Sequence, residues 1–168
     1  MQESALGSVF IFRGRSIGLD NYKSKESLSR VVMNQTFEDM KEIVRKNPFA
    51  QHIGMELLEV TEGYALGRIR LAKQYENIYG GMHGGCAYSL ADTLSGIAAS
   101  TYREYVTMLD ASMNYLLPVE HTEYVYCKAR VLRHGRKITV VRVELLNDEQ
   151  TLLIDGSFTF YSIRKRDE

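Results

Sequence analysis

The stretch from Asn77 to Ser100, NIYGGMHGGCAYSLADTLSGIAAS, decides the fold. Its first half is rich in glycine, and its second half consists mostly of small and apolar residues. From Cys86 to about Tyr102 the apolar residues recur at intervals of three and four, which predicts a helix. Between His83 and Arg103 the only formal charge is Asp92. A helix that is apolar nearly all round is buried, so we expect this helix to form the core that the other elements cover.

The segments around this helix predict a sheet. Upstream, a helical pattern starts after Thr36 and ends at Asn47-Pro48, because the residue before a proline is pushed out of the helical region. The turn Glu62-Gly63 then separates two strand patterns between Leu57 and Leu71. Four further strands are expected at Val106–Leu117, Glu123–Arg133, Lys137–Leu146 and Leu152–Ile163. Short turns between consecutive strands predict an antiparallel meander, and the whole predicts an α+β fold in which a curved antiparallel sheet is wrapped around one long central helix.

Length and composition restrict the class of protein. The chain has 168 residues, and we divide it into a poorly patterned extension, residues 1–33, and a single domain, residues 34–168. Its 21 basic residues balance 21 acidic ones, which argues against a nucleic-acid partner. We find no apolar run of about 20 residues for a membrane span, no signal peptide and no metal-binding cluster. Two cysteines, Cys86 and Cys127, are typical of buried thiols in a reducing compartment, so we expect the cytoplasm.

Asp92 is the first candidate for chemistry. Burying an ionised carboxylate without partners costs several kcal/mol, so the residue needs a reason to be there. It could hydrogen-bond a backbone group or a neighbouring serine, or it could lie at a boundary between subunits. It could equally act as a catalytic base or nucleophile, and both interpretations stay open on periodicity alone.

The glycine-rich loop is the second candidate. Gly80, Gly81, Gly84 and Gly85 leave backbone amides uncovered immediately before a helix. A helix N-terminus offers unpaired N–H groups and the positive end of the helix dipole, which suits an anion or the oxygen that gains charge in acyl transfer. The alternative is that the glycines only turn the chain and allow close packing. Neither a P-loop nor a dinucleotide-binding fingerprint is present.

Three residues of the stretch combine into one site. Asn77 can orient a water or a carbonyl, Gly84 can donate its amide to an oxyanion, and Asp92 can act as base or nucleophile. Asp92 follows Gly84 by eight residues, which is about 12 Å along a helix at roughly 1.5 Å per residue. One reacting carbon cannot touch both groups of the same chain. The spacing therefore predicts an active site shared between two subunits.

The pattern N-x-x-G-x-x-H-G-G-x-x-x-x-x-x-D, from Asn77 to Asp92, resembles the signature of hotdog-fold acyl-CoA thioesterases of the phenylacetate-degradation type. The resemblance runs from about Pro48 to Ile163. It includes the stretches DASMNYLLP, VLRHGRKITVVRVEL and GSFTFYSI. It implies a hotdog fold and a homodimer, or a tetramer built as a dimer of dimers, that acts on acyl-CoA without a metal or other cofactor.

The resemblance also implies roles for single residues. The amide of Gly84 would polarise the thioester carbonyl, and Asp92 of the partner subunit would attack or activate the attacking water. Asn77 would help to hold that water or the product. His83 and Gly85 would support the substrate-binding loop, with His83 more often structural than a base.

Three further positions complete the implied site. Arg136 and Lys137 fall in a turn where such proteins often contact the CoA phosphates, although a solvated turn explains these two residues equally well. Some family members carry Ser or Thr where this chain has Met108, and Thr107 next to it would point to the opposite face of a regular strand. Either activity is low, or Asn77 holds the water alone, or the strand register shifts.

The sequence therefore predicts an acyl-CoA thioesterase that releases a free acid and CoA. Tyr88, Tyr115 and Met108 could line a pocket for an aromatic or a medium-chain acyl group. The alternative is a non-catalytic acyl-CoA-binding or regulatory protein of the same fold, which Met108 and the extra N-terminal segment favour. A hotdog hydratase is disfavoured. Proteins that resemble that class pair an Asp with a His five residues later, and the residue five positions after Asp92 is Ile97.

Overall fold

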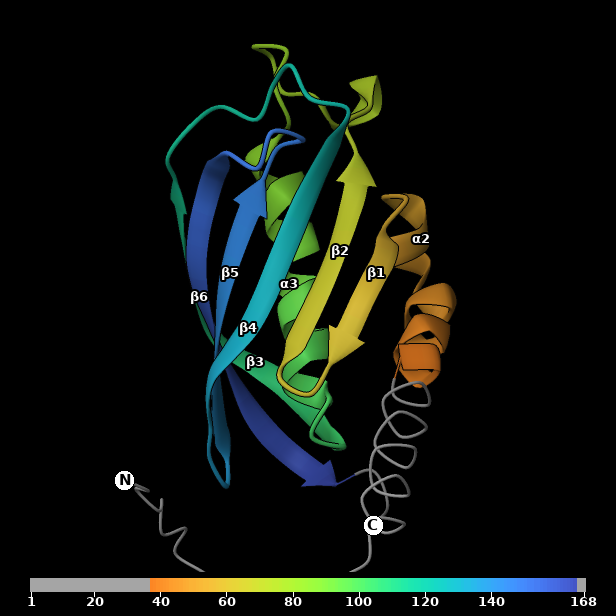
Figure 1. The fold of residues 1–168 in the computed structure, drawn as a ribbon, viewed down its shortest axis with the longest axis vertical. Helices are drawn as coiled ribbons and strands as arrows, with labels where there is room; N and C mark the ends of the chain where they lie inside the picture. Colours follow the sequence, from red (N-terminus) through yellow and green to blue (C-terminus); the bar gives the residue numbers. More distant parts are fainter. Residues whose placement is uncertain (1–36, 166–168) are drawn as a thin grey trace, which may run out of the picture.

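A curved six-stranded antiparallel sheet surrounds one long helix, α3 (Gly84–Ser100), in the computed structural model, which describes residues 37–165 (Figure 1). The strands are β1 (Glu56–Thr61), β2 (Tyr64–Arg70), β3 (Glu104–Tyr115), β4 (Tyr124–His134), β5 (Ile138–Leu146) and β6 (Leu152–Lys165). A short helix, α2 (Pro48–His52), and a single 3-10 turn, η1 (Lys73–Tyr75), complete the named elements. The expected α+β architecture is confirmed.

The order of the strands differs from a meander of four. The sheet runs β1-β2-β4-β5-β6-β3, so β3 lies at the edge beyond β6 and not beside β4. The expectation that the four last strands follow one another as neighbours is therefore wrong for β3. The place beside β4 is taken by β2, which pairs with it from Tyr64↔Arg130 to Arg70↔Tyr124. Residues 116–123 carry the chain from β3 at the far edge back to β4.

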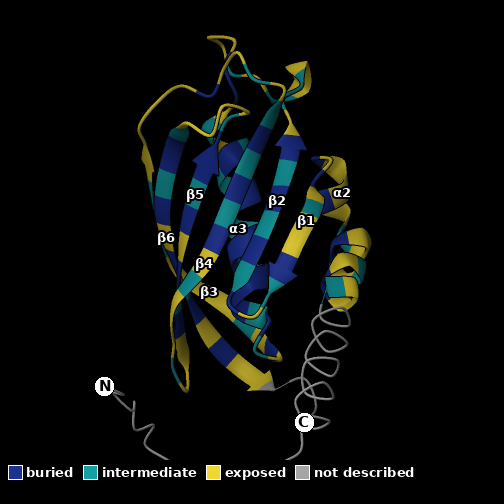
Figure 2. Cartoon of the chain, in the orientation of Figure 1, coloured by how far each residue is buried: buried dark blue, intermediate teal, exposed yellow. Residues whose placement is uncertain are grey.

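The core lies between α3 and the concave face of the sheet. Leu90 and Leu94 of α3 are fully buried, and burying a leucine side chain contributes about 1.5–3 kcal/mol. Side chains of β4 alternate as expected, with Val125, Cys127 and Ala129 buried beneath the helix. Figure 2 shows buried residues along α3 and on the strands that face it. The helix that carries Asp92 is therefore the centre of the domain.

The segment before the sheet is helical. Helical backbone covers residues 37–46 and stops at Asn47, as the Asn47-Pro48 pair predicts. The Oδ1 atom of Asn47 then caps α2 by accepting hydrogen bonds from the N–H groups of Phe49 and Ala50. Thr36, after which the helical pattern starts, and the proposed extension 1–33 lie outside the described residues. No helix within residues 37–165 is long and apolar enough to cross a membrane.

Two glycines in contact with the core should respond oppositely to alanine. A Cβ at Gly67 would lie 2.8 Å from the backbone oxygen of Glu56 and 2.9 Å from Cδ2 of Leu94. We expect Gly67→Ala to lower the free energy of unfolding by about 1–3 kcal/mol. At Gly96, within α3, the nearest atom to a new Cβ is Cε1 of Phe160 at 3.7 Å, which is an ordinary contact. Gly96→Ala should therefore raise the free energy of unfolding by roughly 0.5–1 kcal/mol.

Urea denaturation at one protein concentration measures both glycine variants against the wild type. Equal midpoints for the two variants would contradict the packing of Gly67 beneath α3.

Candidate active site

The N-terminus of α3 is held by the residue that precedes it. His83 has extended backbone, and its Nδ1 atom accepts a hydrogen bond from the N–H of Gly85 at 3.0 Å. The carbonyl of His83 accepts from the N–H groups of Cys86 and Ala87. The helix therefore starts at Gly84, two residues earlier than the sequence pattern predicts, because the histidine ring acts as its cap. Within the described part of the chain, the N–H of Gly84 has no acceptor, so it is free for a ligand.

The side chain of Asn77 organises the loop before this helix. Its Oδ1 atom accepts from the N–H of Tyr79 at 2.8 Å, and its Nδ2 donates to the carbonyl of Met82 at 3.3 Å. Its backbone exchanges further hydrogen bonds with Gly80 and Gly81. Both ends of the amide thus hold the loop, and each end keeps capacity for one more hydrogen bond.

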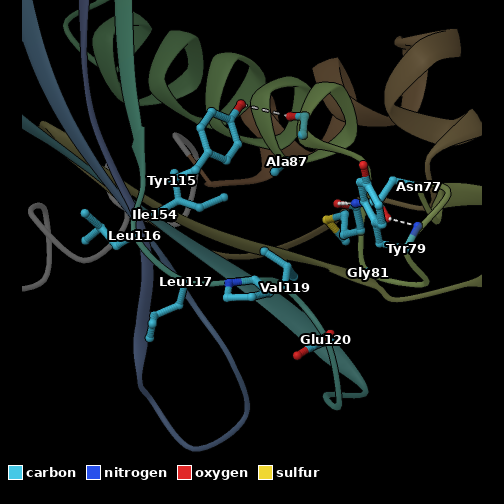
Figure 3. A pocket seen from close by; sticks show the side chains of 13 residues that line it. Asn77, Tyr79, Gly81, Ala87, Tyr115, Leu116, Leu117, Val119, Glu120 and Ile154 are labelled. Atoms are coloured by element: carbon cyan, nitrogen blue, oxygen red, sulfur yellow. Dashed lines mark hydrogen bonds between the residues drawn. The ribbon is translucent and has the colours of Figure 1, made fainter.

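A cavity of about 530 Å³ joins this loop to the end of β3 (Figure 3). Asn77 and Gly84 both border it, so the structure brings these two candidate residues together. Tyr115 crosses the cavity and donates its hydroxyl hydrogen to the carbonyl of Gly84 at 3.0 Å. The sequence suggests Tyr115 only as a pocket residue, and no local pattern reveals this contact with the helix N-terminus. Asp92 does not border this cavity.

Asp92 borders a second cavity, of about 410 Å³, farther along the outward face of α3. Met108 of β3 borders it too, so the structure brings these two candidates together. The candidate residues therefore fall into two groups on one chain: Asn77 and Gly84 in the first cavity, Asp92 and Met108 in the second. This separation agrees with the distance estimated from the helical spacing.

The carboxylate of Asp92 has an unusual environment. Its partial burial raises the pKa of this carboxyl above its ordinary value. No donor to the carboxylate and no ion pair with it is found among residues 37–165. The nearby Ser95 hydroxyl instead donates to the backbone carbonyl of Asp92 at 2.9 Å. The structural interpretation, in which a neighbouring serine satisfies the carboxylate, therefore finds no support in the described contacts.

Strand β3 is irregular beside Asp92. Thr107 pairs with Tyr161 and Met108 with Phe160, and the register then shifts so that Leu109 is skipped. Such bulges bend a strand and redirect its side chains. Both Thr107 and Met108 border the Asp92 cavity, although they are consecutive residues of one strand. The hydroxyl of Tyr88 donates to Sδ of Met108 at 3.6 Å, which ties this edge of β3 to α3.

Arg136 and Lys137 lie in the turn between β4 and β5. Figure 1 places this turn at the end of the sheet opposite to the start of α3. The ammonium of Lys137 lies 5.3 Å from the ring centre of Tyr161, and Arg136 is exposed. The structure therefore does not bring these two cations together with Gly84 of the same chain.

A single central helix inside a curved antiparallel sheet defines the class of protein as a hotdog fold. Residues 79–154 match the model of the thioesterase superfamily. The chain belongs to this family of hotdog-fold thioesterases, of the phenylacetate-degradation type, and it is a thioester hydrolase.

Two comparisons with the PaaI protein of Escherichia coli illustrate the relationship. The acyl-coenzyme A thioesterase PaaI of Escherichia coli is 25% identical over 101 residues, which cover 60% of this chain and 72% of that protein. The structure of the E. coli PaaI protein from the phenylacetic acid degradation operon superposes with a TM-score of 0.76 at 19% identity, over 80% of this chain and 97% of that chain.

Two other solved structures are similar in fold. A conserved protein from Pseudomonas aeruginosa is 30% identical with a TM-score of 0.66, over 70% of this chain and 94% of that chain. A Streptococcus mutans protein solved bound to acetyl CoA is 24% identical with a TM-score of 0.65, over 67% of this chain and 91% of that chain.

Proposed function

We propose that the protein hydrolyses an aromatic or medium-chain acyl-CoA to the free acid and CoA, at a site that two chains of a homodimer form together. The observation that carries this proposal is the division of the candidate groups between two cavities. One holds the amide of Gly84 at a helix N-terminus, the other holds the carboxylate of Asp92, and neither group has a hydrogen-bond partner among residues 37–165. A dimer in which the first cavity of one chain faces the second cavity of its partner supplies both groups to one substrate.

The open edge of β3 supports a dimer. Among the strands that the structure describes, β3 pairs only with β6, so within residues 37–165 one row of its backbone N–H and C=O groups has no partner strand. Leu109 and Tyr115 on β3 are 57% and 54% exposed. Long edge strands with exposed apolar residues are templates for pairing with another chain. Pairing of β3 with β3 of a second copy would cover this edge, and it would set the two α3 helices side by side.

The reaction then follows from the residues. The N–H of Gly84 donates to the thioester oxygen and stabilises the negative charge that develops there. Asp92 of the partner removes a proton from a water, whose oxygen bonds to the thioester carbon. The carbon–sulfur bond breaks, and the sulfur leaves with the proton as the thiol of CoA. Asn77 donates or accepts one further hydrogen bond to hold the water or the product.

The roles of the remaining candidates are part of the same proposal. His83 and Gly85 act as structural support, since they form the cap that positions the Gly84 amide. Arg136 and Lys137 bind the CoA phosphates. The name of the E. coli relative and the acetyl CoA bound to the S. mutans protein support CoA as the carrier. Residues 34–168 form the single catalytic domain, with 1–33 as an extension.

The proposal also includes the oligomeric state of the protein and its compartment in the cell. We expect a homodimer or a dimer of such dimers. Cys86 and Cys127 are both free thiols, which supports the cytoplasm as the reducing compartment where the protein works.

A panel of acyl-CoA thioesters tests the proposal. Acetyl-CoA, straight-chain acyl-CoAs up to long chains, benzoyl-CoA and phenylacetyl-CoA are incubated with the protein, and released CoA is detected with a thiol reagent. We expect the highest kcat/KM with aromatic or medium-chain groups. A blank without substrate corrects for Cys86, which is only partly buried. Binding of acyl-CoA without any release of CoA would contradict the proposal and favour the non-catalytic alternative.

A further inference from the structure

The cavity that holds Asp92 has one wall from outside the sheet and its central helix. Met40, Ile43 and Val44 of the helical segment 37–46 border it, opposite the residues of α3 and β3. Met40 and Val44 are 2% and 5% exposed and anchor the segment to the core. Ile43 is 45% exposed, although it lies on the same helix and borders the same cavity. The fold therefore buries two of these side chains and leaves the third facing an open space.

The cavity extends along α3 away from Asp92. Gly96 and Ser100 follow Asp92 at intervals of four residues on the same face of the helix, and all three border the cavity. Eight residues correspond to about 12 Å along the axis. In Figure 1 the helical segment 37–46 (orange) lies toward the end of the molecule where α3 terminates. The segment therefore flanks the part of the cavity remote from the carboxylate.

The lining selects the chemistry of an occupant. Apart from Asp92, the described residues that border the cavity are apolar or carry uncharged polar groups, and none of them is a lysine or arginine. An anionic group placed there would lose its hydration without gaining a cation, and it would be repelled by Asp92. The occupant that fits is an uncharged apolar group. At roughly 30 Å³ per non-hydrogen atom, the volume of a water molecule in the liquid, the space holds on the order of ten such atoms.

We propose that the helical segment 37–46 closes the far end of the acyl pocket, and that Ile43 limits the length of the uncharged acyl group that the enzyme accepts. This inference rests on the proposed function, because it takes the thioester carbon to lie at Asp92. Gly96 borders the middle of the pocket and, because it has no side chain, leaves room there. Ile43 is a specificity-determining residue, and it takes no part in the chemical step.

Two substitutions of Ile43 test the inference in opposite directions. Ile43→Ala enlarges the far end of the pocket and Ile43→Trp shortens it. The kcat/KM values are measured for straight-chain acyl-CoAs of increasing length. Each methylene that gains or loses its place in the pocket should change kcat/KM about fourfold or more. We expect Ile43→Ala to shift the optimum to longer chains and Ile43→Trp to shift it to shorter chains, by about tenfold in the ratio of long to short substrates.

A matched control separates the pocket from general effects. Leu58 on β1 is 39% exposed and borders none of the cavities discussed above, so Leu58→Ala should leave the chain-length profile unchanged. Since Ile43 is half exposed, both of its variants should unfold at wild-type urea concentrations. An unchanged profile in both Ile43 variants, in an enzyme that hydrolyses acyl-CoA, overturns the inference and leaves the proposed function intact.

A second measurement keeps the inference testable if the wild type hydrolyses no acyl-CoA. That result would overturn the proposed function. Dissociation constants of non-hydrolysable alkyl-CoA thioethers of increasing length are then measured for the wild type and both Ile43 variants. The same opposite shifts in preferred length support the pocket, and identical length dependence in all three proteins overturns it.

Discussion

The Asp92→Asn variant is expected to lose about 10²-fold or more in kcat, the usual contribution of a positioned general base. Asparagine keeps the shape of the side chain and removes its ability to take a proton. KM should change little, because the amide of Gly84 and the proposed phosphate contacts remain. Steady-state kinetics with the best acyl-CoA of the panel measure the loss, and Asp92→Ala should lose at least as much. Wild-type turnover in either variant would show that Asp92 is not the catalytic group.

The Asp92→Asn variant should also show how much the ionised carboxylate of Asp92 lowers the free energy of unfolding. Burial raises the folded-state pKa of Asp92 above its unfolded value, so the ionised form is disfavoured in the fold. The protonated carboxyl of Asp92 therefore makes its full contribution to stability at pH values below the unfolded-state pKa. This contribution is lost as the pH rises through the folded-state pKa. We expect Asp92→Asn to unfold at a higher urea concentration than the wild type at neutral pH, and at the same concentration in acid. A less stable variant at neutral pH would instead show that the carboxylate has a stabilising partner.

The pH dependence of the wild type follows from the same shift. The proposed base, Asp92, would work only when ionised, so kcat/KM should fall as the pH drops through a pKa that lies above the ordinary aspartate value. This acid limb should be missing from the residual activity of Asp92→Asn.

Gly84→Pro is the second substitution with a large expected effect, a loss of about 10²–10³-fold in kcat. Proline removes the amide hydrogen that we propose as the donor to the thioester oxygen. The fold should tolerate it, because Gly84 is the first residue of α3, where proline is favoured. His83 before it already has the extended backbone that a following proline requires, with φ −63° and ψ 131°.

Gly84→Ala is the matched control. It keeps the N–H group and adds a Cβ that would lie 3.3 Å from Cε1 of Tyr115, so the ring has to move by only a few tenths of an ångström. We expect a much smaller loss than in Gly84→Pro, with similar urea midpoints for both. Equal losses in the two variants would point to crowding against Tyr115 and not to the missing amide.

The two inactive variants together test whether the site is shared. Chains carrying Asp92→Asn and chains carrying Gly84→Pro are co-expressed, so that hybrid dimers form. In a hybrid with shared sites, one of the two sites contains an intact Asp92 and an intact Gly84 amide. Random pairing should therefore restore about a quarter of wild-type activity, because half of the dimers are hybrids with one working site each. No recovery would place the complete site within one chain.

The periodicity of apolar residues predicts where the strands of this fold lie in the sequence better than it predicts which strands pair with one another. Each boundary of the four last strands lies within two residues of its expected position. The pairing of β3 with β6 was not predictable, because alternation along a strand identifies its faces and says nothing about which strand lies beside it. The early start of α3 was missed for a local reason, since histidine is not among the usual capping residues.

Some features of the candidate site could likewise be predicted from the sequence, and others could not. The separation of Gly84 and Asp92 could be calculated from the helix geometry alone. The wall formed by Met40, Ile43 and Val44 could not, because it depends on where a distant helix packs. The use of both amide ends of Asn77 within its own loop also requires the folded turn. The spacing of residues along the sequence predicts the candidate chemical groups, while the shape of the pocket depends on tertiary packing.

The position of β3 at the edge beyond β6 affects how the protein is made. A ribosome completes β3 at Tyr115 and begins its partner strand only at Leu152. At about 5–20 residues per second, β3 waits roughly two to seven seconds without a neighbour. The edge through which we propose that two copies associate is thus ordered only when the last strand has emerged. Assembly through this edge therefore has to follow synthesis of β6, and a nascent chain that stops within β6 leaves part of β3 without its partner strand.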